Sequence, residues 1–198
     1  EGDTSPDALG GAVEPLYEIK QPDWMPERLR SYLSVVNYGR RSKQLRYPRY
    51  PFGTNMAFRR DVFLKLGLFD TRLGRTVKQP FQTGEETDLF LRIESAGGRI
   101  QYTPQARVYH NIQARRLNPE WFFEQAYWIG VSFALMEGKA LRSHQVIIKI
   151  LTAFLLIISG YLGWAFAGLV KTSPKSVVYF KCVYLDRWGY ARTLLSNK

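Results

Sequence analysis

Apolar residues recur at helical spacing in several segments of this chain, and short runs of strand-forming residues lie between them. The predicted helices are 28–38, 61–66, 85–96 and 119–136. The predicted strands are 12–19, 54–58, 99–102 and 107–110. The segments 1–11, 40–49 and 74–84 are predicted as loops. This order of short strands and helices predicts a mixed α/β fold.

Helix 85–96 has the clearest pattern. Leu89, Phe90 and Ile93 share one face, and Gly97-Gly98 follows, where positive φ angles can end a helix. In the same way, Gly39 and Gly67 are predicted to end helices 28–38 and 61–66.

The composition changes sharply towards the C-terminus. Residues 150–170 contain no charged side chain, and their length is close to the roughly 20 residues that a helix needs to cross a bilayer core. Tyr161 and Trp164 lie inside this segment rather than at its ends, and basic residues occur on both sides of it. A crossing helix, a helix or re-entrant pair in the membrane interface, and a buried helix of a soluble protein therefore all stay open. We expect residues 139–198 to form a membrane-associated helical tail.

The net charge narrows the kinds of partner. A formal charge of +11 in 198 residues fits an anionic membrane surface, a phosphorylated substrate or a nucleic acid. The basic residues are scattered, and no helix-turn-helix, RNA-recognition or zinc-finger pattern occurs, so nucleic-acid binding is the least favoured of the three. The basic loop 40–49, with Tyr47 inside it, suits anionic lipid headgroups or a polyprenyl-diphosphate acceptor.

Cysteine usage indicates the compartment. Cys182 is the only cysteine, which excludes an internal disulfide and a cysteine-based zinc site and fits a reducing environment. We expect a buried, inert thiol there. The first eleven residues are acidic and small rather than basic and then apolar, so they do not predict a secretory signal.

The most informative polar segment is Gly84-Glu85-Glu86-Thr87-Asp88, at the start of helix 85–96. Three carboxylates in four positions repel one another, and a chain that keeps such an arrangement often uses it as a base or a metal-linked site. The structural alternative is that Thr83 and Glu86 form a capping box and that the acids suit the helix dipole. Spacing alone leaves both interpretations open.

Four motifs in order resemble family 2 glycosyltransferases. They are Phe52-Gly53-Thr54-Asn55-Met56-Ala57-Phe58-Arg59-Arg60, Gly67-Leu68-Phe69-Asp70, Gly84-Glu85-Glu86-Thr87-Asp88-Leu89, and Pro104 through Val108 to His110. The resemblance covers residues 8 to about 135. It implies the acceptor-side half of a GT-A fold over residues 1–138, followed by the hydrophobic helical tail.

The resemblance also implies a nucleotide-binding half with an Asp-x-Asp motif. No Asp-x-Asp occurs in these 198 residues. We therefore expect the chain to begin just after the donor half and to be unable to catalyse sugar transfer alone.

The resemblance implies an inverting reaction, in which an acceptor hydroxyl attacks the anomeric carbon and a nucleoside diphosphate leaves. A carboxylate must take the hydroxyl proton, and the resemblance places this base at Glu86, with Asp88 as the second candidate. The family most often has Asp where this chain has Glu86, so the side chain here is one methylene longer. Glu85 is expected to orient acceptor hydroxyls, and Gly53 and Asn55 to shape the acceptor pocket.

Basic residues near the fourth motif are the remaining candidates. The resemblance implies that His110 ligates a divalent metal, Mg or Mn, together with the Asp-x-Asp half, or contacts the diphosphate; a structural histidine is the alternative. Arg115 and Arg116 are predicted to bind the departing diphosphate, and solvated surface arginines are the alternative. Trp121 and Trp128 are expected to pack in the core rather than to stack on a sugar or on lipid.

Together these expectations describe a membrane-associated glycosyltransferase on the cytoplasmic face of the cell membrane, which builds surface or exported polysaccharide. Its expected partners are a nucleotide-sugar donor, a saccharide or polyprenyl-linked acceptor and the membrane, with no nucleic acid. The alternative is a non-catalytic, membrane-associated partner protein derived from a glycosyltransferase.

Overall fold

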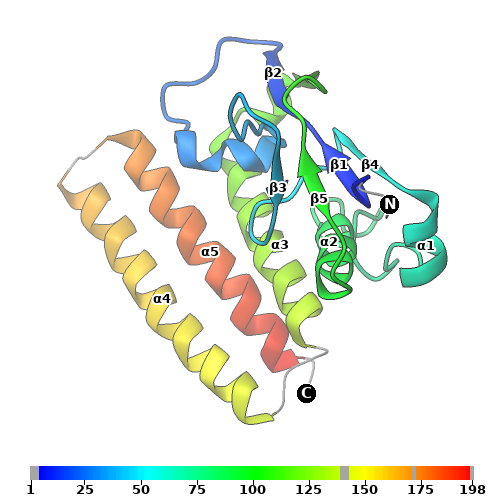
Figure 1. Cartoon of the computed structure of the whole chain (residues 1–198). Helices are drawn as coiled ribbons and strands as arrows, with labels where there is room; N and C mark the ends of the chain where they lie inside the picture. Colours follow the sequence, from blue (N-terminus) through cyan, green and yellow to red (C-terminus); the bar gives the residue numbers. More distant parts are fainter. Residues whose placement is uncertain (1–4, 139–142, 171–172, 197–198) are drawn as a thin grey trace. The chain divides into compact units, whose positions relative to one another are not determined.

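The computed structural model describes residues 5–138, 143–170 and 173–196 (Figure 1). The chain forms two compact units, each assembled from separate stretches of sequence. The first unit comprises the residues up to Leu16, then Leu33–Thr71 and Glu85–Ile112. The second comprises Tyr17–Tyr32, Arg72–Gly84 and the residues from Gln113 onward. The sequence predicts a different division, into a catalytic region over residues 1–138 and a tail over residues 139–198. That division is by function rather than by compactness, and it stays a prediction.

Short strands come first along the chain and long helices come last. The strands are β1 (Ala8–Gly10), β2 (Val13–Tyr17), β3 (Lys43–Leu45), β4 (Met56–Phe58), β5 (Ile100–Tyr102) and β6 (Val108–Ile112). The helices are α1 (Arg60–Leu66), α2 (Glu85–Ser95), α3 (Pro119–Gly138), α4 (Ser143–Leu169) and α5 (Pro174–Ser196), with 3-10 helices η1 (Glu27–Leu33) and η2 (Ala114–Arg116). The mixed α/β class is therefore as predicted.

The first unit contains a four-stranded sheet in the order β3-β5-β1-β4. β1 and β5 run parallel, with Ala8 opposite Ile100, while β3 and β4 are antiparallel to their neighbours. β2 and β6 form a second, two-stranded sheet. α2 belongs to the core of this unit through Leu89, Phe90 and Ile93, which are almost fully buried as the sequence predicts.

The second unit contains three long helices, and α5 lies between α3 and α4 (Figure 1). At the crossing of α3 and α5, a Cβ on Gly130 would overlap the carbonyl oxygen of Asp186. A Cβ on Gly189 would overlap the carbonyl oxygen of Tyr127. The two backbones thus approach more closely than any side chain at these positions would allow. Cys182 of α5 is buried, as predicted.

Apolar side chains of α4 are distributed in an unusual way. Small residues such as Ala153, Gly160 and Ala167 are buried, and a Cβ on Gly163 would lie 2.8 Å from the ring of Phe180 on α5. Val146 and Ile157 are buried too, but most of the large apolar residues are exposed, among them Ile147, Ile148, Leu151, Leu155, Ile158, Leu162, Phe166 and Leu169. Within the described part of the chain, Gln145–Leu169 is the one helix that is long and apolar enough to cross a membrane, by length and composition.

Three predicted segments differ from the structure. Residues 1–11 and 40–49 are not only loops, because they contain β1 and β3. These strands are three residues long, which is too short to show a period of two. The helix predicted over 28–38 is the 3-10 helix η1, which ends at Leu33; Ser34 has a φ of 58°, and Val36 then forms an antiparallel bridge with Val13.

The start of α2 also differs from its prediction. The helix begins at Glu85, directly after Gly84 with a φ of 117°, so Thr83 lies too far back to form the capping box with Glu86. The backbone N–H of Thr83 donates instead to Ser132 Oγ at 3.1 Å. At the other end, Gly97 has a positive φ of 76° as predicted, whereas Gly98 is not among the described residues with positive φ. The remaining predicted helices and strands are confirmed, with ends that differ by a few residues.

Candidate functional site

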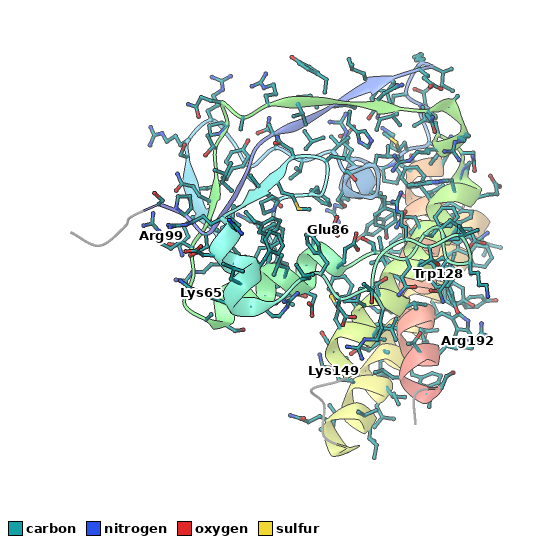
Figure 2. All side chains as sticks on the ribbon, turned by 90° about the vertical axis from the view of Figure 1, so that its right-hand side faces the viewer. Lys65, Glu86, Arg99, Trp128, Lys149 and Arg192 are labelled. Carbon is teal, nitrogen blue, oxygen red and sulfur yellow. The ribbon has the colours of Figure 1, made fainter. Side chains whose placement is uncertain are left out.

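Three carboxylates lie in the first turn of α2, in the first unit. Glu85, Glu86 and Asp88 are each half-buried, and Figure 2 shows Glu86 at the N-terminal end of this helix. A helix N-terminus carries a partial positive charge and unpaired backbone N–H groups, which stabilise carboxylates there. The immediate surroundings of each carboxylate then decide what it does.

Asp88 is held by an ion pair. Arg92, one turn later, places both Nε and Nη2 at 2.9 Å from Asp88 Oδ2. The same guanidinium donates from Nη1 to the carbonyl of Leu66 (2.5 Å) at the end of α1. Asp88 therefore orients and neutralises the arginine that joins α2 to α1.

Glu85 has a buried oxygen atom without a partner. Among the residues that the structure describes, its Oε2 is shielded from solvent and has no hydrogen-bond partner. Leaving such an acceptor unpaired is unfavourable by about 1–3 kcal/mol or more. Most buried polar atoms of native proteins have a hydrogen-bond partner, so this oxygen is an exception. A bound hydroxyl group would satisfy this oxygen, in agreement with the acceptor-orienting role predicted for Glu85.

The carboxylate of Glu86 lies against the backbone of Gly53. A Cβ on Gly53 would overlap Glu86 Oε1 and would lie 3.4 Å from Cδ and 3.8 Å from Cγ. Gly53 itself is exposed. The sequence predicts Glu86 and Gly53 as parts of one site, and the structure brings them into contact although they are 33 positions apart in the chain.

Asn55 supports the loop that carries Gly53. Its Nδ2 donates to the backbone carbonyls of Ala12 (3.0 Å) and Ala106 (2.7 Å), which lie in two other segments of the first unit. Its backbone N–H donates to the carbonyl of Phe52 at 2.8 Å. These bonds show how Asn55 fixes the loop; its predicted contact with an acceptor stays a prediction.

His110 lies on β6, and its Nδ1 is 3.0 Å from the carbonyl oxygen of Leu33. A carbonyl can only accept, so Nδ1 carries the proton and, in the neutral ring, the lone pair lies on Nε2. This is the tautomer that metal-ligating histidines commonly have. Within the described residues, no group of three or more His, Cys, Asp or Glu side chains could hold a metal ion. His110 can thus supply one ligand, and the others would have to come from elsewhere.

An open hollow of about 730 Å³ also lies in the first unit. It is lined by Glu14, Asn37, Gly39, Arg40, Tyr102, Pro104, Gln105 and Arg107. Asn37 is hydrogen-bonded within it, to Glu14 (3.0 Å), to the backbone of Gly39 (2.9 Å) and to Tyr102 (3.3 Å). Pro104, Gln105 and Arg107 of the fourth motif and Arg40 of the basic loop line the hollow. None of the residues predicted to act as base, to bind acceptor or diphosphate, or to ligate a metal lines it, so we do not include it in the candidate site.

Arg115 and Arg116 lie in the second unit, in the turn η2 just before α3. Asn118 holds this turn, because its Nδ2 donates to the carbonyl of Arg115 (2.7 Å) and its Oδ1 accepts from the backbone N–H of Trp121 (2.8 Å). Asn at the N-cap followed by Pro119 at the first helical position is a strong helix start. The start of α3 therefore fixes the backbone of the turn that carries the two arginines. Arg115 is exposed and donates to Gln113 at 2.8 Å.

Arg116 is half-buried in a hydrophobic and basic environment. Its guanidinium lies over the ring of Trp121, 4.6 Å from the centroid, and its Nη2 is 3.4 Å from the carbonyl of Tyr32. Its Nε is buried without a hydrogen-bond partner among the described residues. Burial, and then the charges of Arg75 and Arg115, lower the pKa of Arg116 to about 10. A partly desolvated guanidinium among other cations attracts an anion strongly.

Arg75 is a residue that the sequence analysis missed. It lies in the segment Arg72–Gly84, which packs on the start of α3 through Phe81, whose ring is 5.8 Å from that of Trp121. The side-chain amide of Gln82 donates to the carbonyl of Arg72 (2.6 Å) and closes the segment into a compact loop. The sequence signal was a basic residue in a Gly- and Pro-containing loop, which is too common to single out.

The structure thus groups the predicted residues into two sets. Glu85, Glu86, Asp88, Gly53, Asn55 and His110 belong to the first unit, and Arg115 and Arg116 to the second. The tryptophans are half-buried rather than in the core. Trp121 packs against Phe81 (5.8 Å between ring centroids), whereas the ring contact given for Trp128 is with its sequence neighbour Tyr127 (5.8 Å).

Comparison with known proteins supports the enzyme class that the motifs indicate. A curated protein of Haloferax volcanii, described as a glucosyl-dolichyl phosphate glucuronosyltransferase, is 31% identical to this chain over 137 residues. The matched region is 68% of this chain and 44% of that protein, so the chain spans less than half of the relative's length. No family model and no solved structure matches the chain. The chain is therefore similar to a glycosyltransferase, in agreement with the resemblance drawn from its motifs.

Proposed function

We propose that this chain is the acceptor-side portion of an inverting glycosyltransferase that moves a sugar from a nucleotide-sugar onto a lipid-linked acceptor. The contact between Gly53 and Glu86, in the first turn of α2, carries this proposal. It joins two of the motifs and gives the carboxylate predicted as the base a defined position. The similarity to a protein described as a glucosyl-dolichyl phosphate glucuronosyltransferase supports the lipid-linked acceptor. The product would be a surface or exported polysaccharide or glycan.

In the proposed reaction, the acceptor hydroxyl oxygen forms a bond to the anomeric carbon of the donor while the bond to the nucleoside diphosphate breaks. Glu86 takes the hydroxyl proton, and the electron pair of the broken bond leaves with the diphosphate. A positioned base of this kind contributes about 10²–10⁴-fold to the rate. Asp88 is the second candidate, and its carboxylate is held by Arg92 in an ion pair.

Glu85 would orient the acceptor. Its buried Oε2 lacks a partner among the described residues, so it can accept a hydrogen bond from an acceptor hydroxyl group without giving up another bond.

Arg116, with Arg115 and Arg75, would hold the phosphate groups. The charges of Arg75 and Arg115 act on Arg116, whose buried Nε is still unpaired within the described chain. Guanidinium groups pair with phosphate oxygens through charge-assisted hydrogen bonds, which strengthen as charge develops on the leaving group.

A divalent metal is expected at His110, with the remaining ligands from an Asp-x-Asp motif. The Nδ1–H bond to the Leu33 carbonyl leaves Nε2 as the ligating atom, which fits this role. When bound, Mg²⁺ or Mn²⁺ would compensate the charge of the donor diphosphate. The residues of this chain would orient the acceptor, take its proton and bind phosphate.

We also propose that α4 contacts the membrane, with the site on the cytoplasmic face. Its large exposed side chains are apolar over most of its length, and a polyprenyl-linked acceptor is itself held in the lipid.

The substitution Glu86→Gln tests the proposal in the whole protein that the gene encodes. A nucleotide-activated glucuronic acid and glucosyl-dolichyl phosphate are the first pair to assay, since the relative's name specifies a glucuronosyl group and this lipid. Glutamine keeps the size but cannot take a proton, so we expect turnover to fall by about 10²-fold or more with an unchanged unfolding temperature. Glu120→Gln, an exposed acid in the first turn of α3, is the matched control and should keep wild-type turnover. Full activity of the Glu86→Gln enzyme would refute the role.

A further inference from the structure

We propose that Gly53 is a positioning residue for Glu86: its missing side chain provides the space that places the Glu86 carboxylate. The inference rests on the proposed function for its catalytic meaning. The contact itself is a property of the first unit alone.

The end of the Glu86 side chain occupies the space that a side chain at position 53 would need. A Cβ there would overlap Oε1, with Cδ at 3.4 Å and Cγ at 3.8 Å. The three atoms nearest to such a Cβ all belong to Glu86, so this side chain occupies the space. The carboxylate therefore lies where the Cβ of any other residue at position 53 would be.

The backbone does not require glycine at this position. Gly39, Gly67, Gly74, Gly84 and Gly97 have positive φ angles, and Gly53 is not among them. An alanine at position 53 could therefore adopt the native backbone, and its main effect would fall on Glu86.

The loop around Gly53 cannot easily move away. Asn55 is hydrogen-bonded to Ala12, Ala106 and Phe52, and Pro51 is buried. The carbonyl of Tyr50 accepts a hydrogen bond from Tyr38 at 2.9 Å. Four bonds thus fix the loop, whereas the Glu86 side chain has three rotatable bonds. A new methyl group would move the carboxylate rather than the loop.

A displaced base loses rate rather than binding. A shift of about 1 Å in a reacting group can lower the rate by about 10²-fold, because the proton transfer depends on its geometry. Aspartate at position 86 is one methylene shorter and would end before it reached a Cβ at position 53. The two positions should therefore be coupled.

A double-mutant cycle in the whole protein tests this coupling. We expect Gly53→Ala to lower kcat by at least about tenfold while KM changes by less than about threefold. We expect Glu86→Asp to lower kcat by a smaller factor in the Gly53→Ala background than in the wild type. Gly168→Ala is the control, because a Cβ there meets nothing within 4 Å. Wild-type kcat in Gly53→Ala, or equal factors in both backgrounds, would overturn the inference.

A crystal structure of the Gly53→Ala variant of the whole protein separates this inference from the proposed function. The Glu86 carboxylate should lie away from position 53 in the variant, while the loop that carries this position keeps its place. This readout needs no activity. If the wild type transfers no sugar but the carboxylate is displaced, the contact stands and the proposed function fails. If the carboxylate keeps its place, or the loop moves instead, the positioning inference fails whether or not the enzyme is active.

Discussion

Glu86 and Asp88 are two positions apart in one helical turn, yet they have different partners. Asp88 has Arg92 four residues later on the same side of the helix, and the spacing by itself predicts such a pair. Glu86 contacts a glycine from another segment, which no local spacing indicates. Side chains of similar chemistry therefore differ in their roles because of what each one meets.

Arg75 is expected to strengthen the proposed phosphate site through its charge on Arg116. We expect Arg75→Ala to weaken the binding of a nucleoside diphosphate by about 3–10-fold at low salt and to reduce the salt dependence of binding. Lys78→Ala removes the same charge from the same segment and should have a smaller effect. Calorimetric titration of the whole protein at two ionic strengths measures both. Equal losses in the two variants would show that only the net charge matters.

Asp186 makes stability depend on pH. Burial raises its pKa to about 6, and the adjacent Arg187, 3.4 Å away, only partly opposes this. Because the folded-state pKa lies above the unfolded value, the favourable contribution is complete below about pH 4 and is lost as the pH rises through 6. The loss is on the order of 3 kcal/mol.

Asp186→Asn should therefore raise the unfolding temperature at pH 7.5 and change it little at pH 4. Circular dichroism melts of the wild type and the variant at both pH values measure the difference. The same temperature difference at both pH values would contradict a raised pKa for this carboxyl.

At the scale of elements, α3 and α5 depend on glycine where they cross. Gly130 faces the backbone of Asp186 and Tyr190, and Gly189 faces the backbone of Tyr127. Backbone atoms cannot move aside as a flexible side chain can, so added volume there must separate the helices.

Gly130→Ala is therefore expected to destabilise the protein by at least about 2–3 kcal/mol. Gly138→Ala in the same helix is the matched control, because a Cβ there meets Leu194 at an ordinary 3.5 Å. Denaturant unfolding of both variants gives the two free energies. A smaller loss for Gly130→Ala than for Gly138→Ala would show that the helices are not packed this closely.

At the scale of the whole molecule, α4 presents most of its large apolar side chains outward, and small residues such as Gly160 and Gly163 face α5. In water this arrangement would be unfavourable, because it exposes a long apolar surface. In lipid it is favourable, since small residues allow close helix packing while large ones contact acyl chains. The net charge of +11 would add attraction to an anionic leaflet.

We expect the wild-type protein to float with vesicles that contain anionic phospholipid. Leu155→Glu/Leu162→Glu places two charges on the exposed face, at side chains that are 69% and 60% exposed, and should reduce the floating fraction at least about tenfold. Leu64→Glu is the control, because Leu64 is 72% exposed on α1. Unchanged flotation of the double variant would indicate that another surface binds the lipid.

The local pattern of the sequence determined much of this protein. Leu89, Phe90 and Ile93 predict the buried face of α2, and Gly67 and Gly97 predict where α1 and α2 end, since these features depend on residues a few positions apart. The same local pattern indicates the exposed apolar helix α4 and, through motifs in order, the similarity to glycosyltransferases.

Only the tertiary structure decided the rest, because it depends on residues that are distant in sequence. β1 and β3 are three residues long and exist through their pairing with β5, so their own sequence carries almost no signal. η1 ends at Leu33 because Val36 pairs with Val13. The contact of Glu86 with Gly53 and the charge of Arg75 on Arg116 likewise arise when separate segments pack together. Local spacing thus determines which groups are present, and packing determines which of them meet.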